Sequence, residues 1–139
     1  MPDKAQPVSG SCLCGGVRYE VDHFERGVVA CHCTQCRKTS GHYVAATKAT
    51  HDHLRMILDG TLKWYRSSEA AERGFCSECG SNLFWRKVGD NATSIMAGAL
   101  DGPTGLSMQS HIYAADIGDY YELDDGVPIY PQSDKVKYS

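Results

Sequence analysis

The chain has 139 residues, of which 14 are basic and 17 acidic, and its formal net charge at pH 7 is −3. This length is typical of one domain with a modest core, to which metal crosslinks would add stability. No basic run marks a nucleic-acid-binding or membrane-binding surface, and apolar runs such as Ile95–Leu100 are far too short to span a bilayer. The polar N-terminus lacks the apolar stretch of a signal peptide, so we expect a cytoplasmic protein.

Most of the pattern along the chain predicts short strands. Val17–Val21 alternates apolar and polar residues with a period of two, as a half-buried strand does. The further candidates are separated by Gly, Asp, Asn or Pro, and they are Leu54–Leu58, Thr61–Arg66, Asn82–Arg86, Thr93–Ala97 and His111–Tyr113. Between the first two of these, Asp59-Gly60 predicts a hairpin turn.

One segment departs from the strand pattern. Thr34–Ser40 is polar and does not alternate, and Thr34 could cap one or two helical turns that end at Gly41. The last stretch, Asp116–Ser139, is rich in Asp, Tyr and Pro, and we expect it to wrap the surface. The sequence therefore predicts a mainly β domain of short strands pinned by metal.

Seven cysteines are a strong enrichment in a chain of this size. An odd number and the lack of an export signal argue against a disulfide framework. The cysteines also lie in tight clusters, Cys12-Leu13-Cys14, Cys31-His32-Cys33-Thr34-Gln35-Cys36 and Cys76-Ser77-Glu78-Cys79. Neighbours this close suit a shared metal ion better than a bridge between them, and the alternatives are disulfides or inert buried thiols.

Seven thiolates divide naturally into four and three, because zinc takes four protein ligands in structural sites and often three where it does chemistry. Two of the clusters resemble each other, since Gly15 follows Cys14 and Gly80 follows Cys79. Glycine after the last ligand permits a positive φ, so that backbone N–H groups can turn toward the sulfurs. We expect these two clusters to form one closed structural zinc site, made of Cys12, Cys14, Cys76 and Cys79.

Cys31, Cys33 and Cys36 remain as a compact group of three. Their fourth position could hold water, a substrate thiolate or a side chain such as His32 or His42. If Thr34 starts a helix, the sulfurs lie near its N-terminus, which favours thiolates.

Arg37 and Lys38 follow this group at once. They are interpreted either as an exposed basic turn or as a site that attracts the carboxylates of an anionic ligand.

Other arrangements stay open at this point. The spacing alone also permits Cys12 and Cys14 to pair with Cys33 and Cys36, and four thiolates can hold an iron–sulfur cluster. His51 and His53 flank an acidic residue and could bind metal, although a solvated turn is the simpler interpretation.

Three stretches resemble the glutathione-dependent formaldehyde-activating enzyme family, which is related to centromere-protein-V-like proteins. They are Gly10-Ser11-Cys12-Leu13-Cys14-Gly15-Gly16-Val17-Arg18-Tyr19, Cys31-His32-Cys33-Thr34-Gln35-Cys36-Arg37-Lys38-Thr39-Ser40-Gly41 and Phe75-Cys76-Ser77-Glu78-Cys79-Gly80-Ser81-Asn82-Leu83. With weaker similarities at Gly98–Pro103, His111–Tyr113 and Asp125–Pro128, the resemblance spans about residues 9 to 130. It divides the chain into a flexible N-terminus (1–8), a zinc domain (9–130) and a C-terminal tail (131–139).

The resemblance implies an Mss4-like fold with two zinc ions per chain. Cys12, Cys14, Cys76 and Cys79 match the family's structural zinc ligands. Cys31, Cys33 and Cys36 match a second, labile zinc site associated with glutathione, for which Arg37 and Lys38 are the candidate contacts. The implied reaction is the reversible condensation of glutathione with formaldehyde to S-hydroxymethylglutathione, a carbon–sulfur lyase activity in the reverse direction.

The physical account predicts that the bound glutathione sulfur attacks formaldehyde while a nearby group protonates the oxygen, with His42 and His111 as candidate donors. The alternatives are a non-catalytic zinc- or thiol-binding module and a chromatin role like that of the centromere relatives. The acidic charge balance argues against the chromatin role, and we expect a small thiol or thiol–aldehyde adduct as the partner, with neither nucleic acid nor membrane. The sequence predicts no oligomeric state.

Overall fold

The computed structural model describes residues 6–133, and within them it shows ten short strands, one α-helix and three 3₁₀ turns. The described chain divides into two compact units. The first comprises the described residues up to Arg26 together with Thr47–Gly105, and the second comprises Gly27–Ala46 together with the described residues from Leu106 onward. The mainly β fold class is confirmed, and its antiparallel strands and cysteine clusters agree with the expected Mss4-like fold.

The first unit contains a three-stranded antiparallel sheet in the order β1-β2-β5. Its strands are β1 (Val8–Ser11), β2 (Arg18–Val21) and β5 (Leu54–Leu58). Tyr19 of β2 is almost fully buried, and its ring lies edge-on to Phe84 with centroids 5.0 Å apart.

The same unit contains four further strands, which are neighbours in a separate sheet in the order β9-β8-β7-β6. They are β6 (Leu62–Arg66), β7 (Ala71–Cys76), β8 (Asn82–Lys87) and β9 (Ala92–Met96). The 3₁₀ turns η1 (His51–His53) and η2 (Ala97–Ala99) also belong to this unit. All five residues of β9 are buried.

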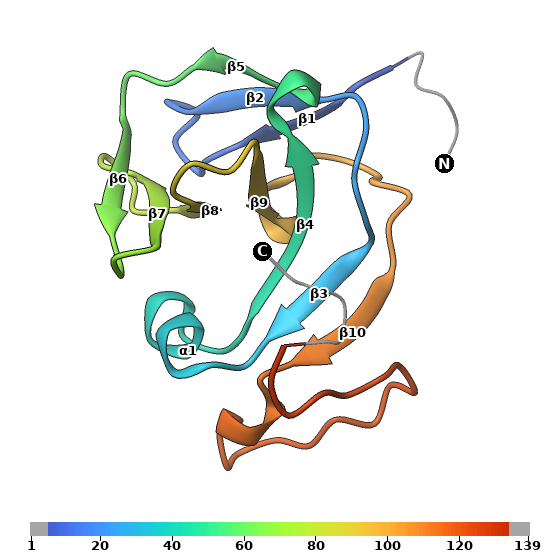
Figure 1. Ribbon diagram of the computed structural model, residues 1–139. Coiled ribbons are helices and arrows are strands. Elements are labelled where there is room, and N and C mark those ends of the chain that lie inside the picture. The colour runs from blue at the N-terminus through green and yellow to red at the C-terminus, as the bar shows by residue number, and fades with distance from the viewer. Residues whose placement is uncertain (1–5, 134–139) are drawn as a thin grey trace. The chain divides into compact units, whose positions relative to one another are not determined.

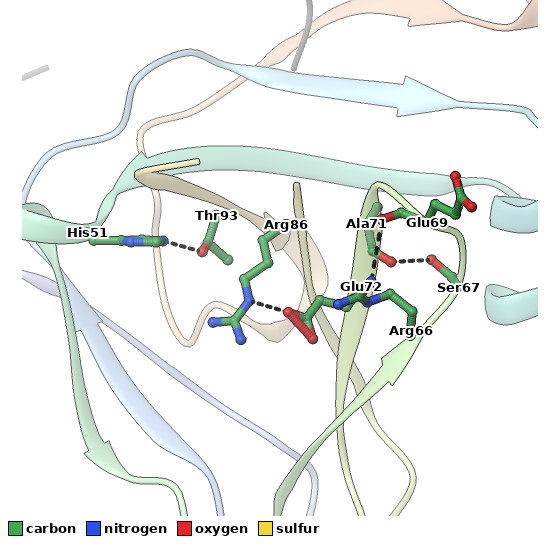
Figure 2. A network of polar contacts seen from close by, with 8 residues as sticks. All are labelled: His51, Arg66, Ser67, Glu69, Ala71, Glu72, Arg86 and Thr93. Atoms are coloured by element: carbon green, nitrogen blue, oxygen red, sulfur yellow. Dashed lines mark hydrogen bonds and ion pairs between the residues drawn. The ribbon is translucent and has the colours of Figure 1, made fainter. Parts of the chain in front are cut away.

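A cross-strand cluster fixes β7, the strand that ends at Cys76. In the strand register, Gly74 of β7 lies opposite Trp64 of β6 and Phe84 of β8, and the two rings stack with centroids 6.0 Å apart. A Cβ atom at Gly74 would lie 3.0 Å from the Trp64 ring, so glycine leaves the room that the ring occupies. The Cζ atom of Arg86 lies 3.6 Å from the centroid of the Trp64 ring. Its Nε donates to Glu72 Oε2 at 3.2 Å, as Figure 2 shows.

The second unit is built on β3 (Val28–Cys31), which pairs with β10 (Met108–Ile112) on one side and with the start of β4 (Val44–Thr50) on the other. The β3–β10 pair is parallel, an exception to the antiparallel pattern. The helix α1 (Thr34–Ser40) connects β3 to β4, as Figure 1 shows. The 3₁₀ turn η3 (Ala114–Asp116) follows β10.

Beyond η3, the described residues 117–133 contain no helix or strand. This segment bonds to β10 through its backbone, since Tyr130 N donates to His111 O at 2.9 Å and His111 N donates to Pro128 O at 3.0 Å. Residues 1–5 and 134–139, which include most of the predicted terminal segments, lie outside the described residues.

The predicted helix is confirmed, with a difference at its start. The helix covers Thr34–Ser40 and ends at Gly41, whose φ of 87° is the left-handed value that glycine tolerates. Its N-cap is Cys33 rather than Thr34, because the Cys33 sulfur accepts from Cys36 N.

One predicted connection is wrong. Asp59-Gly60 forms a turn, with Leu62 N donating to Asp59 O at 3.1 Å, but it does not form a hairpin. The strand before the turn, β5, pairs with β2, whereas the strand after it, β6, pairs with β7. The turn therefore passes the chain from one sheet to another. No helix among residues 6–133 is long and apolar enough to cross a membrane.

Candidate metal centres

Four cysteines of the first unit converge from two turns that are far apart in the sequence. Cys12 and Cys14 lie in the turn after β1, while Cys76 ends β7 and Cys79 lies in the turn before β8. Each turn ends at a glycine with a positive φ, 83° at Gly15 and 81° at Gly80. The backbone can thus reverse behind the second cysteine of each pair, as the sequence predicts.

The geometry of these four sulfurs fits a tetrahedral metal ion. All four lie within 4.8 Å of one another, with Sγ–Sγ distances of 3.7 Å from Cys12 to Cys14 and 3.8 Å from Cys14 to Cys76. A tetrahedral zinc site with Zn–S bonds of about 2.3 Å has sulfurs about 3.8 Å apart. A disulfide requires about 2.05 Å, and all seven cysteines are free thiols. The four sulfurs are soft ligands, they would fill all four positions of a tetrahedral ion, and their spacing matches that of a zinc site.

Backbone N–H groups point at the sulfurs of this cluster. Val17 N donates to Cys12 Sγ at 3.2 Å, while Glu78 N and Cys79 N donate to Cys76 Sγ at 3.4 and 3.5 Å. Such donors stabilise thiolates and orient them toward a shared cation.

Two hydroxyl groups act in the same sense. Thr61 Oγ1 lies 3.3 Å from Cys76 Sγ and lowers the pKa of that thiol. Ser81 Oγ lies 3.2 Å from Cys79 Sγ, and its hydrogen bond is the main cause that lowers the pKa of Cys79 to about 5. A thiolate is the form that binds metal, so these contacts prepare the cluster for a cation.

Three cysteines of the second unit form another cluster. Cys31 ends β3, Cys33 caps α1 and Cys36 lies in its first turn, and their sulfurs lie within 4.8 Å of one another. Hydrogen bonds from the Cys31 and Cys36 thiols lower the pKa of Cys33 to about 2, whereas the pKa of Cys31 is raised, chiefly by its bonds with Cys33 and Cys36. The group thus holds one thiolate readily, and three such donors leave one position of a tetrahedral ion open.

The structure places the seven predicted ligands in groups of four and three, and these are the metal-sized clusters of His, Cys, Asp and Glu among residues 6–133. The alternative grouping, in which Cys12 and Cys14 join Cys33 and Cys36, is not the one that the structure brings together. Two clusters can therefore hold metal ions, and the identity of those ions is taken up below.

His32 does not serve as a fourth ligand in this arrangement, because both its ring nitrogens are used elsewhere. Its Nε2 lies 2.9 Å from His111 Nδ1, and its Nδ1 bonds to the Tyr121 hydroxyl. His111 Nε2 in turn bonds to Asp125 Oδ2 at 2.9 Å. The result is a continuous series of hydrogen bonds, Tyr121–His32–His111–Asp125, which we call the histidine network.

The carboxylate of Asp125 only accepts, so His111 donates from Nε2. With Nδ1 of His111 as an acceptor, His32 donates from Nε2 and accepts from the Tyr121 hydroxyl at Nδ1. Burial is the main cause that lowers the pKa of His32 to about 4, and the bond from His111 lowers the pKa of Asp125. The two histidines are buried, with 0% and 2% of their surface exposed.

His42 lies just beyond α1, where it is exposed and its Nδ1 lies 2.6 Å from the Tyr120 hydroxyl. Its ring also contacts Tyr43 and Tyr121, each with centroids 4.5 Å apart. Of the two candidate proton donors, His42 keeps one ring nitrogen outside the Tyr120 bond, whereas His111 has both nitrogens engaged.

Arg37 and Lys38 differ in their surroundings. The Nε atom of Arg37 is buried and has no hydrogen-bond partner among residues 6–133. Burial is the main cause that raises the pKa of Tyr121, and the positive charge of Arg37 opposes this rise. Lys38 is exposed on the helix. Arg37 is therefore the better candidate for an anionic ligand.

The remaining histidine pair forms no metal cluster. His51 Nε2 bonds to Thr93 Oγ1 at 2.8 Å (Figure 2), and His53 Nδ1 bonds to Asp22 Oδ1 at 2.6 Å. The two rings thus serve separate structural contacts.

The histidine network is a feature of this unit that the sequence patterns do not predict. His32 is 79 positions from His111 and 89 positions from Tyr121, so no local spacing in the sequence reveals these contacts. The weak similarities at His111–Tyr113 and Asp125–Pro128 were the available signal, since each contains one member of the network.

Comparisons with known proteins find a matching family, two relatives and a solved structure of similar fold. The sequence profile described as glutathione-dependent formaldehyde-activating enzyme matches residues 7–116. An uncharacterized lyase of Schizosaccharomyces pombe is 26% identical over 129 residues, 92% of this chain and 93% of that protein. A Halomonas elongata protein, provisionally named a glutathione-dependent formaldehyde-activating enzyme, is 34% identical over 89 residues, 55% of this chain and 54% of that protein. A Rhodobacter sphaeroides crystal structure shares the fold, with a TM-score of 0.60, 24% identity, and coverage of 87% of this chain and 98% of that chain.

We predict that the four-cysteine cluster carries the metal on which folding depends. Cys76→Ser should lower the melting temperature strongly, because a structural metal contributes several kcal/mol of folding free energy. Cys36→Ser should change the melting temperature by only a few degrees. Thermal unfolding followed by circular dichroism measures both. The assignment would be contradicted if Cys76→Ser left the melting temperature unchanged while Cys36→Ser lowered it strongly.

Proposed function

The chain belongs to the family of glutathione-dependent formaldehyde-activating enzymes, and from this premise we propose that it is a zinc-dependent carbon–sulfur lyase. Its substrate is an adduct between glutathione and an aldehyde, with S-hydroxymethylglutathione as the specific candidate. The observation that carries the proposal is the group of Cys31, Cys33 and Cys36, whose sulfurs lie within 4.8 Å of one another at the end of β3 and the start of α1.

The residues at this group fit zinc. Three sulfur donors match its preference for soft ligands, and three protein ligands are typical of sites where zinc does chemistry. When bound, zinc would supply an open position that keeps a thiol sulfur deprotonated at neutral pH. Cys31 and Cys33 are partly exposed, which supports access for a small thiol, whereas Cys36 is buried and would anchor the ion.

The proposed reaction forms and breaks one carbon–sulfur bond. In condensation, the glutathione sulfur attacks the formaldehyde carbon, the thiol proton is released, and the electron pair of the carbonyl bond moves to oxygen. That oxygen takes up a proton to give the hydroxymethyl group, and cleavage reverses each step. His42 is the proposed proton donor, because it is exposed beside α1 and retains a ring nitrogen outside its bond to Tyr120.

Arg37 is the proposed contact for a glutathione carboxylate. A buried donor without an acceptor costs free energy, and a carboxylate oxygen would satisfy the buried Nε atom. Guanidinium groups bind carboxylates in a planar, two-pronged geometry that lysine does not reproduce. Lys38, which is exposed, would contribute only a screened charge.

We predict that zinc-loaded protein accelerates the exchange between glutathione plus formaldehyde and S-hydroxymethylglutathione. Exchange spectroscopy by NMR measures this rate directly, and the spontaneous rate without protein is the baseline. Cys33→Ala should return the rate to that baseline, while Thr34→Ala, at an exposed neighbouring position, should keep it. A wild-type rate equal to the baseline would reject formaldehyde activation and leave a thiol-binding role.

A second prediction concerns glutathione affinity. Arg37→Ala should raise the dissociation constant for glutathione about 10-fold or more, because a charge-assisted hydrogen bond contributes about 1.5–3 kcal/mol. Lys38→Ala, next to it on the same helix, should change the constant less than about twofold. Titration calorimetry of the zinc-loaded variants measures both constants. Equal effects of the two substitutions would argue against a specific contact at Arg37.

A further inference from the structure

His32 lies between two of the three cysteines of the second cluster, and it is turned away from them. The chain is extended here, since Cys31 ends a strand and Cys33 has φ −67° and ψ 163°. Burial alternates accordingly, with Cys31 and Cys33 partly exposed and His32 fully buried. In an extended chain neighbouring side chains point to opposite sides, so a fixed His32 fixes the two cysteines on the other side.

Three hydrogen bonds fix His32. Its backbone N–H donates to Ile112 O of β10 at 3.0 Å. Its ring Nε2 lies in hydrogen-bond contact with His111 Nδ1 at 2.9 Å, and its Nδ1 bonds to the Tyr121 hydroxyl. Every polar atom of the side chain is therefore satisfied, as burial requires.

Asp125 completes the anchor from the C-terminal segment. It accepts from His111 Nε2 at 2.9 Å and is itself bonded by Val127 N at 3.4 Å. The backbone of the same segment bonds to His111 on both its N–H and its carbonyl group. The carboxylate side chain is 43% exposed, so a substitution there removes a hydrogen bond without opening a cavity in the core.

We infer that Asp125, His111, His32 and Tyr121 are positioning residues, which hold Cys31 and Cys33 at the spacing that a metal ion requires. This inference rests on the proposed metal site and assigns the histidine network a role that does not involve contact with the substrate. Without the network, the extended segment must be ordered when the metal binds, and that ordering reduces affinity. Partners that orient metal ligands typically affect metal affinity by 10- to 100-fold.

Cobalt(II) is the probe, because its thiolate charge-transfer absorption reports sulfur coordination independently of turnover. The full-length chain is titrated with cobalt(II), and Cys33→Ala provides the spectrum of the four-cysteine cluster alone. Asp125→Ala and Tyr121→Phe should each weaken binding at the three-cysteine cluster about 10-fold or more. Asp125→Asn keeps an acceptor oxygen for His111 and should stay within about threefold of the wild type. Asp124→Ala, at the exposed neighbouring carboxylate, is the matched control and should bind as the wild type does.

The inference is overturned if both Asp125→Ala and Tyr121→Phe bind cobalt with wild-type affinity. It is also overturned if Asp125→Asn loses as much affinity as Asp125→Ala, because charge rather than the hydrogen bond would then be responsible. The inference is likewise overturned if the wild type gives the same cobalt spectrum as Cys33→Ala, because the three-cysteine cluster would then bind no cobalt. Failure of the exchange reaction with wild-type cobalt binding intact would reject the proposed function and leave this inference standing.

Discussion

The meeting of four sulfurs from two distant turns is the constraint on which the first unit depends. Cys12 and Cys76 are 64 positions apart, yet their sulfurs belong to one cluster within 4.8 Å. Bringing them together requires β1 and β7 to end at the same place, and the packing of β7 between Trp64 and Phe84 serves that requirement. Because the unit is small, a metal that joins the two turns would replace much of the stabilisation that a larger core provides.

The three-cysteine cluster follows a different design. Its ligands come from one short stretch of chain, so no distant strands have to meet to form it. A strand end and a helix start supply the sulfurs, and Cys33 takes part in both the cluster and the helix cap. The residues that hold His32 between these ligands come from distant parts of the sequence, namely β10 and the C-terminal segment. This arrangement supports the proposal that the three-cysteine cluster binds an exchangeable ligand at the fourth position of its metal ion.

The sequence predicted what local patterns determine. The glycine-flanked cysteine turns, the helix Thr34–Ser40 and the strand Leu54–Leu58 each follow from neighbouring residues, and the structure has them within those bounds. Four strands among residues 6–133 were not predicted: β1, β3, β4 and β7. For two of them the reason is local, because Val28–Cys31 is apolar throughout and Val44–Thr50 consists mostly of small residues without clear alternation. The Asp59-Gly60 hairpin failed for another reason, since strand pairing is decided by partners elsewhere in the chain. The histidine network likewise depends on contacts across about 80 residues, which spacing alone does not reveal.

The central claim is that one cluster is closed by four protein sulfurs while the other leaves a position for a thiol. X-ray absorption at the zinc K-edge, recorded on protein loaded with two zinc ions with and without glutathione, tests it most directly. The account predicts an average of about 3.5 sulfurs per zinc without glutathione, rising to about 4 when it is added. An average that starts at about 4 and does not change would contradict the open position, and with it the proposed chemistry.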